Sequence, residues 1–107
     1  MPHSARNRRR SARKPHKLRA MVELGGSCSL ASIVSFAREG VGLATDIHTL
    51  PRRFDRVRVQ FKCDQGEIVL TGDVRWSTAR SGTRSEYGVE LRDAGAAYTG
   101  FYDSLPN

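Results

Sequence analysis

Apolar and polar residues alternate over most of the chain, which is the pattern of β-strands with one buried face. The alternation predicts five or six short strands, over about residues 17–24, 28–36, 40–43, 56–63, 67–76 and 86–91. Gly25-Gly26 marks a turn between the first two, because glycine adopts positive φ without steric strain. Asp64-Gln65-Gly66 predicts a three-residue hairpin connection between the fourth and fifth segments. Gly72, in the middle of the fifth segment, predicts a bulge or bend.

The period changes from that of a strand to that of a helix after Asp93. Tyr98, Phe101 and Leu105 fall at positions i, i+3 and i+7, and Asp93 is the predicted N-cap. We expect a short C-terminal helix at about 94–105 that lays this aromatic edge on the strands. Because no predicted helix is long enough for a βαβ crossover, the pattern indicates a mostly β fold, a small antiparallel β-barrel.

Basic residues are concentrated at the start of the chain. The first nineteen residues contain eight Lys or Arg and no Asp or Glu, whereas the remainder is close to neutral, so the formal charge of +7 belongs to the N-terminal segment. Residues 1–14 show no periodicity and are predicted to form a flexible basic arm. The barrel with its helix is expected over 15–107. A flexible cationic arm predicts a polyanionic partner.

Composition narrows the class of protein further. No apolar run approaches the roughly 20 residues that span a bilayer, and no apolar segment follows the basic N-terminus as in a secretory signal. Two cysteines are too few for a disulfide framework, so we expect a reduced, cytoplasmic protein. The histidines and cysteines lack zinc-like spacing, and no nucleophile elbow or phosphate-cradling loop occurs, so we expect neither a metal site nor an enzyme.

Several segments of the chain together carry a family resemblance. The first is Arg9-Arg10-Ser11-Ala12-Arg13, an Arg-x-x-x-Arg motif, with Arg6 to Arg10 as an alternative register of the same spacing. Together with the strand-break-strand segment 33–43 and the later segments 72–76 and 87–91, this motif resembles the PilZ family. The resemblance implies a six-stranded antiparallel barrel with a C-terminal helix. It also implies a regulatory domain of bacterial signalling that binds cyclic di-GMP.

The second motif of that family, Asp/Asn-x-Ser-x-x-Gly, is altered in this chain. Its positions are occupied by Ser35, Ala37 and Gly40, so only the glycine is kept. Serine at 35 still offers one hydroxyl, but alanine at 37 has no polar side-chain atom. The resemblance implies that Arg9 and Arg13 grip guanine and phosphate. It gives Ser35 a residual polar contact and lets the ligand approach the backbone at Gly40.

Two alternatives remain open from the sequence. The altered second motif favours a PilZ adaptor that does not bind cyclic di-GMP and acts through contacts with a downstream protein. The basic arm alone would also suit a barrel that binds nucleic acid, although the strands lack the interleaved aromatic and basic residues of a stacking surface. Phe61, Trp76 and Tyr87 lie on the predicted inward faces and are expected in the core. Arg56 and Arg58 share the predicted solvated face.

Overall fold

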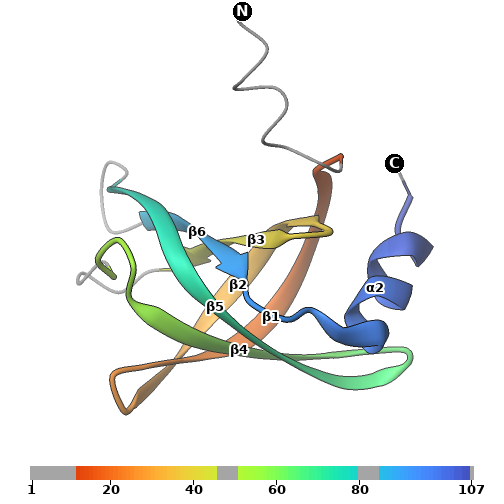
Figure 1. Ribbon diagram of the computed structural model, residues 1–107, viewed down its shortest axis with the longest axis horizontal. Coiled ribbons are helices and arrows are strands. Elements are labelled where there is room, and N and C mark those ends of the chain that lie inside the picture. Colours follow the sequence, from red (N-terminus) through yellow and green to blue (C-terminus); the bar gives the residue numbers. More distant parts are fainter. Residues whose placement is uncertain (1–11, 46–50, 80–84, 107) are drawn as a thin grey trace, which may run out of the picture.

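Six antiparallel strands close into a barrel in the residues that the structure describes, with one helix at its end (Figure 1). The computed structural model describes residues 12–45, 51–79 and 85–106. The strands are β1 (Lys14–Leu24), β2 (Ser27–Ala37), β3 (Gly40–Thr45), β4 (Arg56–Cys63), β5 (Gly66–Ala79) and β6 (Ser85–Leu91). They pair in the cyclic order β1-β2-β3-β6-β5-β4, and the helix α2 covers Gly95–Ser104. The predicted fold class, a mostly β antiparallel barrel with a C-terminal helix, is confirmed.

The local sequence predicted one connection correctly and two local features incorrectly. Gly25 and Gly26 join β1 to β2 with φ of 59° and 83°, as a glycine pair allows. The β4–β5 connection is one residue shorter than the sequence predicted, because Gly66 already pairs with Cys63 and only two residues form the turn. The predicted bulge at Gly72 is also misplaced, since the register shift falls between Val74 and Trp76.

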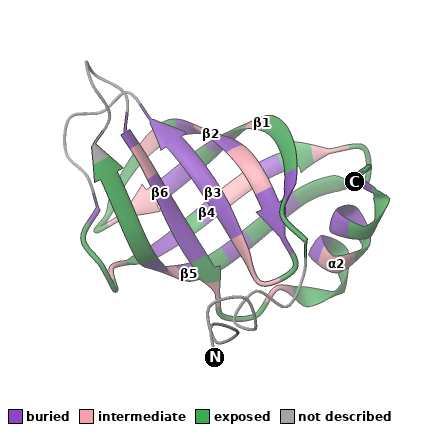
Figure 2. Ribbon diagram, turned by 90° about the horizontal axis from the view of Figure 1, so that it is seen from above, coloured by how far each residue is buried: buried purple, intermediate pink, exposed green. Residues whose placement is uncertain are grey.

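The side chains that fill the barrel interior come from all six strands. Figure 2 shows buried residues along these strands and in α2. Phe36 is fully buried near the end that α2 covers, and its ring lies 5.7 Å from that of Phe61 and 5.2 Å from that of Phe101. Aromatic pairs at such tilted or edge-on geometries add to the stabilisation from burial. Tyr87 is buried as predicted, and burial raises the pKa of its hydroxyl to about 12.

Helix α2 closes one end of the barrel with the face that its spacing predicted. Tyr98, Phe101 and Leu105 are all buried there. The predicted N-cap is wrong, however: the N-cap position is Ala94, and no side chain caps the helix. The helix begins at Gly95, with φ of 77°, so Asp93 lies one residue before the N-cap position, and the alanine at that position has no side-chain acceptor for the free N–H groups.

Ion pairs cover part of the outer surface. Asp73 accepts hydrogen bonds from Arg56 at 2.9 Å and from Arg92 at 3.0 Å. The hydrogen bond from Arg56, together with that from Arg92, lowers the pKa of the Asp73 carboxyl below its ordinary value. Arg56 and Arg58 are both exposed on one face, as expected, and Arg58 lies 3.6 Å from Glu23. These solvated pairs are each worth little to stability.

Candidate ligand-binding site

Four outward-facing residues form a row across neighbouring strands of the barrel. Ser35 of β2 pairs with Gly42 of β3, Gly42 pairs with Gly88 of β6, and Gly88 pairs with Trp76 of β5. We call this row the glycine strip. Its two central members have no side chain and are both buried, Gly42 against the Ser35 hydroxyl and Gly88 beneath the Trp76 indole. The missing side chains let the serine and the indole lie close to the main chain.

Arg13 lies over the serine end of the glycine strip. Its Nη1 donates a hydrogen bond to Ser35 Oγ at 3.0 Å, and the same nitrogen lies 3.5 Å from where a Cβ on Gly42 would be. That Cβ would also come within 2.7 Å of Ser35 Oγ. A side chain at position 42 would therefore displace the contact between arginine and serine. In the described part of the chain, Arg13 has no carboxylate partner, so its charge is open to an anion.

Trp76 occupies the opposite end of the strip, and its position corrects the prediction of a core residue. The side chain is 43% exposed. The register shift between Val74 and Trp76 explains this, because one extra residue moves the following side chain to the other face of the sheet. A Cβ on Gly88 would overlap the five-membered ring of the indole, so the glycine is what allows Trp76 to lie there.

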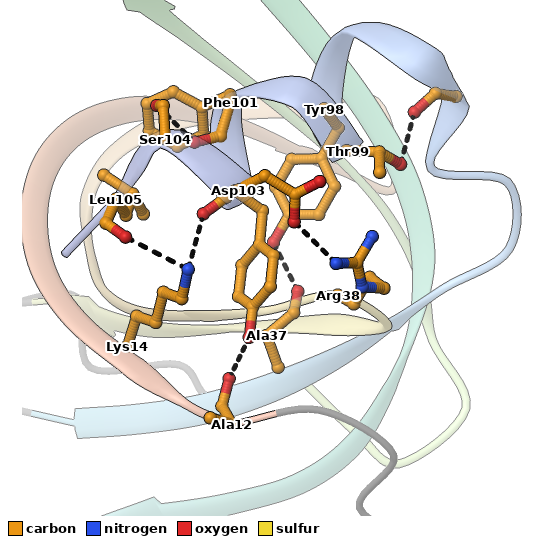
Figure 3. Close-up of polar contacts among 12 residues, drawn as sticks. Ala12, Lys14, Ala37, Arg38, Tyr98, Thr99, Phe101, Asp103, Ser104 and Leu105 are labelled. Carbon is orange, nitrogen blue, oxygen red and sulfur yellow. Dashed lines mark hydrogen bonds and ion pairs between the residues drawn. The ribbon is translucent and has the colours of Figure 1, made fainter. Parts of the chain in front are cut away.

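The segment that carries Arg13 is anchored on both sides to α2 (Figure 3). Lys14 is only 7% exposed, and its Nζ donates to the carbonyl oxygens of Tyr102 and Leu105, each at 3.0 Å. The ammonium also lies 4.2 Å from the ring centroid of Tyr102. The Tyr102 hydroxyl in turn donates to the carbonyl oxygen of Ala12. Arg13 is thus held between two residues that are fixed by the helix, and its position depends on α2.

The altered second motif is explained only in part by its surroundings. Ser35 is half-buried and contacts Arg13, whereas Ala37 is 3% exposed. The carbonyl oxygen of Ala37 accepts a hydrogen bond from the Tyr98 hydroxyl at 2.5 Å. Burial raises the pKa of Tyr98 above its ordinary range, so this donor keeps its proton. Position 37 therefore joins α2 to the β2–β3 hairpin rather than lining the glycine strip.

The structure brings together only some of the residues predicted for the site. Arg13 and Ser35 are in contact, and Arg9 lies outside the described residues. Gly40 pairs with Ala37, and a Cβ there would meet the carbonyl oxygen of Val89 at 2.7 Å. Close packing of β3 on β6 accounts for that glycine, so a ligand contact at Gly40 stays a prediction.

Sequence reasoning missed Gly42, Gly88 and Trp76. Each glycine stands between two apolar residues at an outward position, which is a weak signal that a strand surface has been left bare. Nothing in the sequence indicated that the two glycines are neighbours, because they are separated by more than forty residues and meet only through the β3–β6 register.

Solved structures of two bacterial proteins have a fold similar to that of this barrel. Their sequence identities to this chain are low, so the similarity shows the fold alone. The inhibitor of motility (MotI/DgrA) of Bacillus subtilis has a TM-score of 0.74 and 10% identity, over 87% of this chain and 46% of that one. The PlzA protein of Borreliella burgdorferi, solved in complex with c-di-GMP, has a TM-score of 0.67 and 11% identity, over 90% of this chain and 50% of that one. The chain spans about half the length of these proteins.

The sequence itself matches the family model of the PilZ domain over residues 7–98. The chain therefore belongs to the PilZ family, as the resemblance of its segments predicted. No curated protein matches the sequence. PilZ domains are regulatory binding domains rather than enzymes. Within the described ranges, no helix is long and apolar enough to cross a membrane, and no cluster of His, Cys, Asp and Glu could hold a metal ion.

Proposed function

We propose that this PilZ domain is a receptor for cyclic di-GMP, with the ligand bound on the glycine strip. The observation that carries the proposal is the placement of the Arg13 guanidinium and the partly exposed Trp76 indole at the two ends of the glycine strip. The similarity in fold to PlzA, whose structure contains c-di-GMP, supports the same ligand class. Such a receptor would act in bacterial signalling, in the cytoplasm, and would pass the signal to a downstream protein.

The two side chains suit the two chemical parts of the ligand. A guanidinium can bind guanine O6 and N7 through two hydrogen bonds, grip a phosphate, or stack on a purine. The exposed part of the Trp76 indole offers a surface for base stacking, which contributes about 1–3 kcal/mol per base. Because Gly42 and Gly88 have no side chains, none projects from the row between the guanidinium and the indole, and a flat ligand can bridge both groups.

The basic arm would supply the remaining contacts. The predicted arm ended at Lys14, but Lys14 already belongs to β1. We propose that the arm before β1 brings Arg9, four positions before Arg13, over the ligand. Ser35 would give a residual polar contact, and Gly40 would permit backbone approach. The polar atoms missing from the second motif remove about one or two hydrogen bonds of roughly 0.5–1.5 kcal/mol each. The arm must therefore provide much of the affinity.

Ligand binding at Arg13 would alter the contacts between β1 and α2. Ala12 and Lys14 flank the arginine, and both contact the C-terminal turn of the helix. A ligand that pulls Arg13 away from Ser35 would strain these contacts, and a ligand that holds it in place would reinforce them. This link is a physical route from ligand to partner surface.

Calorimetric titration of the full chain with cyclic di-GMP tests the proposal. Trp76 is the only tryptophan, so its fluorescence reports binding at the strip directly. We expect saturable heat and a fluorescence change in parallel, both lost in Arg13→Ala and in the double variant Arg9→Ala, Arg13→Ala. The matched control Arg52→Ala removes one exposed arginine elsewhere and should bind like the wild type. Absence of binding at high micromolar ligand would remove the receptor assignment.

The adaptor alternative is favoured by the burial of Ala37 and by the engagement of Ser35 with Arg13. Ser35→Asp separates the two functions, because a carboxylate at this place restores the first position of the motif. An adaptor would gain cyclic di-GMP binding that the wild type lacks. A nucleic-acid-binding barrel would instead show length-dependent DNA or RNA binding with a steep salt dependence, and nucleic acid would displace cyclic di-GMP.

A further inference from the structure

A second row of outward-facing side chains crosses the barrel on other strands, and most of it is apolar. Leu30 of β2 pairs with Met21 of β1, Met21 pairs with Gln60 of β4, and Gln60 pairs with Val69 of β5. Leu30, Met21 and Val69 are 59%, 40% and 43% exposed. Of the five large apolar side chains exposed in the described ranges, three therefore lie in one row. Single exposed apolar residues need no explanation, but a contiguous set marks a contact surface.

A groove runs beside this row at the point where β1 and β4 separate. Their pairing extends over Met21–Leu24 and Val57–Gln60, and beyond Met21 and Gln60 the two strands no longer pair with each other. The groove has a volume of about 430 Å³. Its apolar lining comes from Leu18, Ala20, Met21, Leu30 and Phe61. We call this feature the β1–β4 groove.

The charged side chains at the β1–β4 groove are predominantly basic. Arg19 and Lys62 line it and are exposed, and within the described residues neither forms an ion pair or a side-chain hydrogen bond. The acidic residue in the lining, Glu67, is the cross-strand neighbour of Lys62, and its Oε2 accepts a hydrogen bond from Gln60 Nε2. The lining therefore carries two cations and one anion, and a net positive charge beside an apolar floor suits a partner that brings carboxylates next to apolar side chains.

We propose that the β1–β4 groove binds an amphipathic segment of a partner protein, with large apolar side chains in the groove and Asp or Glu facing Arg19 and Lys62. A second copy of this chain fits less well, because it would bring the same two cations against each other. The groove shares no residue with the glycine strip, so the docking surface stands whether or not the domain binds cyclic di-GMP.

Peptide selection with matched variants tests this surface. The probe is a library of random 16-residue peptides displayed on phage, selected against the full chain after depletion on the variant Met21→Ser, Leu30→Ser. Both replaced side chains are exposed, so melting by circular dichroism should stay close to the wild type. The recovered peptides should combine apolar residues with Asp or Glu. Each should lose about tenfold or more in affinity on this variant, as expected when exposed contact side chains are truncated.

The charge requirement is tested separately with Arg19→Glu, Lys62→Glu, which should weaken the same peptides by about tenfold or more at low salt. Phe54→Ser and Arg52→Glu replace an exposed aromatic and an exposed cation away from the groove, and should bind as the wild type does. Selection that yields no peptide preferring the wild type overturns the proposal, as do peptides without carboxylates. A concentration-dependent dimer in sedimentation that Leu30→Ser abolishes would assign the groove to self-association instead.

Discussion

Replacing Lys14 with methionine is the most direct test of how α2 is held on the barrel. Methionine keeps an unbranched stem of similar length and removes the ammonium, so the change isolates the contacts made by Nζ. Lys14 donates to the carbonyl oxygens of Tyr102 and Leu105, both at 3.0 Å, and is 7% exposed. Tyr102 O still accepts a hydrogen bond from the Leu105 amide at 3.1 Å, but Leu105 O loses its donor.

The magnitude follows from these contacts. A hydrogen bond from a charged donor contributes about 1.5–3 kcal/mol, and a cation at a helix C-terminus adds about 0.3–1 kcal/mol. The cost of burying the ammonium offsets part of the sum. We therefore expect Lys14→Met to lower the free energy of unfolding by about 2–4 kcal/mol. For a domain of this size that is a decrease in Tm on the order of 10 °C or more.

Urea and thermal denaturation followed by circular dichroism measure this change, with Lys17→Met as the control. Lys17 is exposed, and Lys17→Met removes the same charge from the same strand, so the free energy of unfolding should change by no more than about 0.5 kcal/mol. Hydrogen exchange should show faster exchange of the α2 amides in Lys14→Met alone. Equal stability of the two variants would refute the reasoning, because it would mean that the ammonium gains no more in the folded state than a methyl group does.

Three further results are expected. Gly88→Val should displace Trp76, shift its fluorescence emission and destabilise the fold by about 1–3 kcal/mol. Gly100→Ala, where the new Cβ meets no atom within 4 Å, should instead stabilise α2 by about 1 kcal/mol. Thermal denaturation of each variant measures these changes in stability. Because its pKa is lowered, Asp73 contributes stability above about pH 4 that is lost as the pH falls through its folded-state pKa, so acid titrations of Asp73→Asn should lack that loss. Because burial raises the pKa of Tyr87 to about 12, stability should decline between about pH 10 and 12, and absorbance at 295 nm should show its ionisation delayed until unfolding.

Local periodicity determined most of the fold. Alternation placed Phe61 and Tyr87 inside, and the spacing of Tyr98 and Phe101 identified the face of α2 that covers the barrel. These inferences succeed because a strand or helix buries one face, and that face is encoded by residues close together in the sequence. The concentration of positive charge in the first nineteen residues is likewise a property of the sequence alone.

Pairing between distant strands decided the candidate site. Strict alternation predicts that Trp76 is a core residue, and only the register shift after Val74 turns its side chain outward. Gly42 and Gly88 become neighbours on one face of the barrel through the β3–β6 register. Lys14 belongs to the basic run in sequence, yet it is buried against carbonyl groups of α2 more than eighty residues away. The sequence therefore determined which faces are apolar and where the charge lies. The tertiary structure decided which outward residues meet, because strand register depends on contacts that no local pattern encodes.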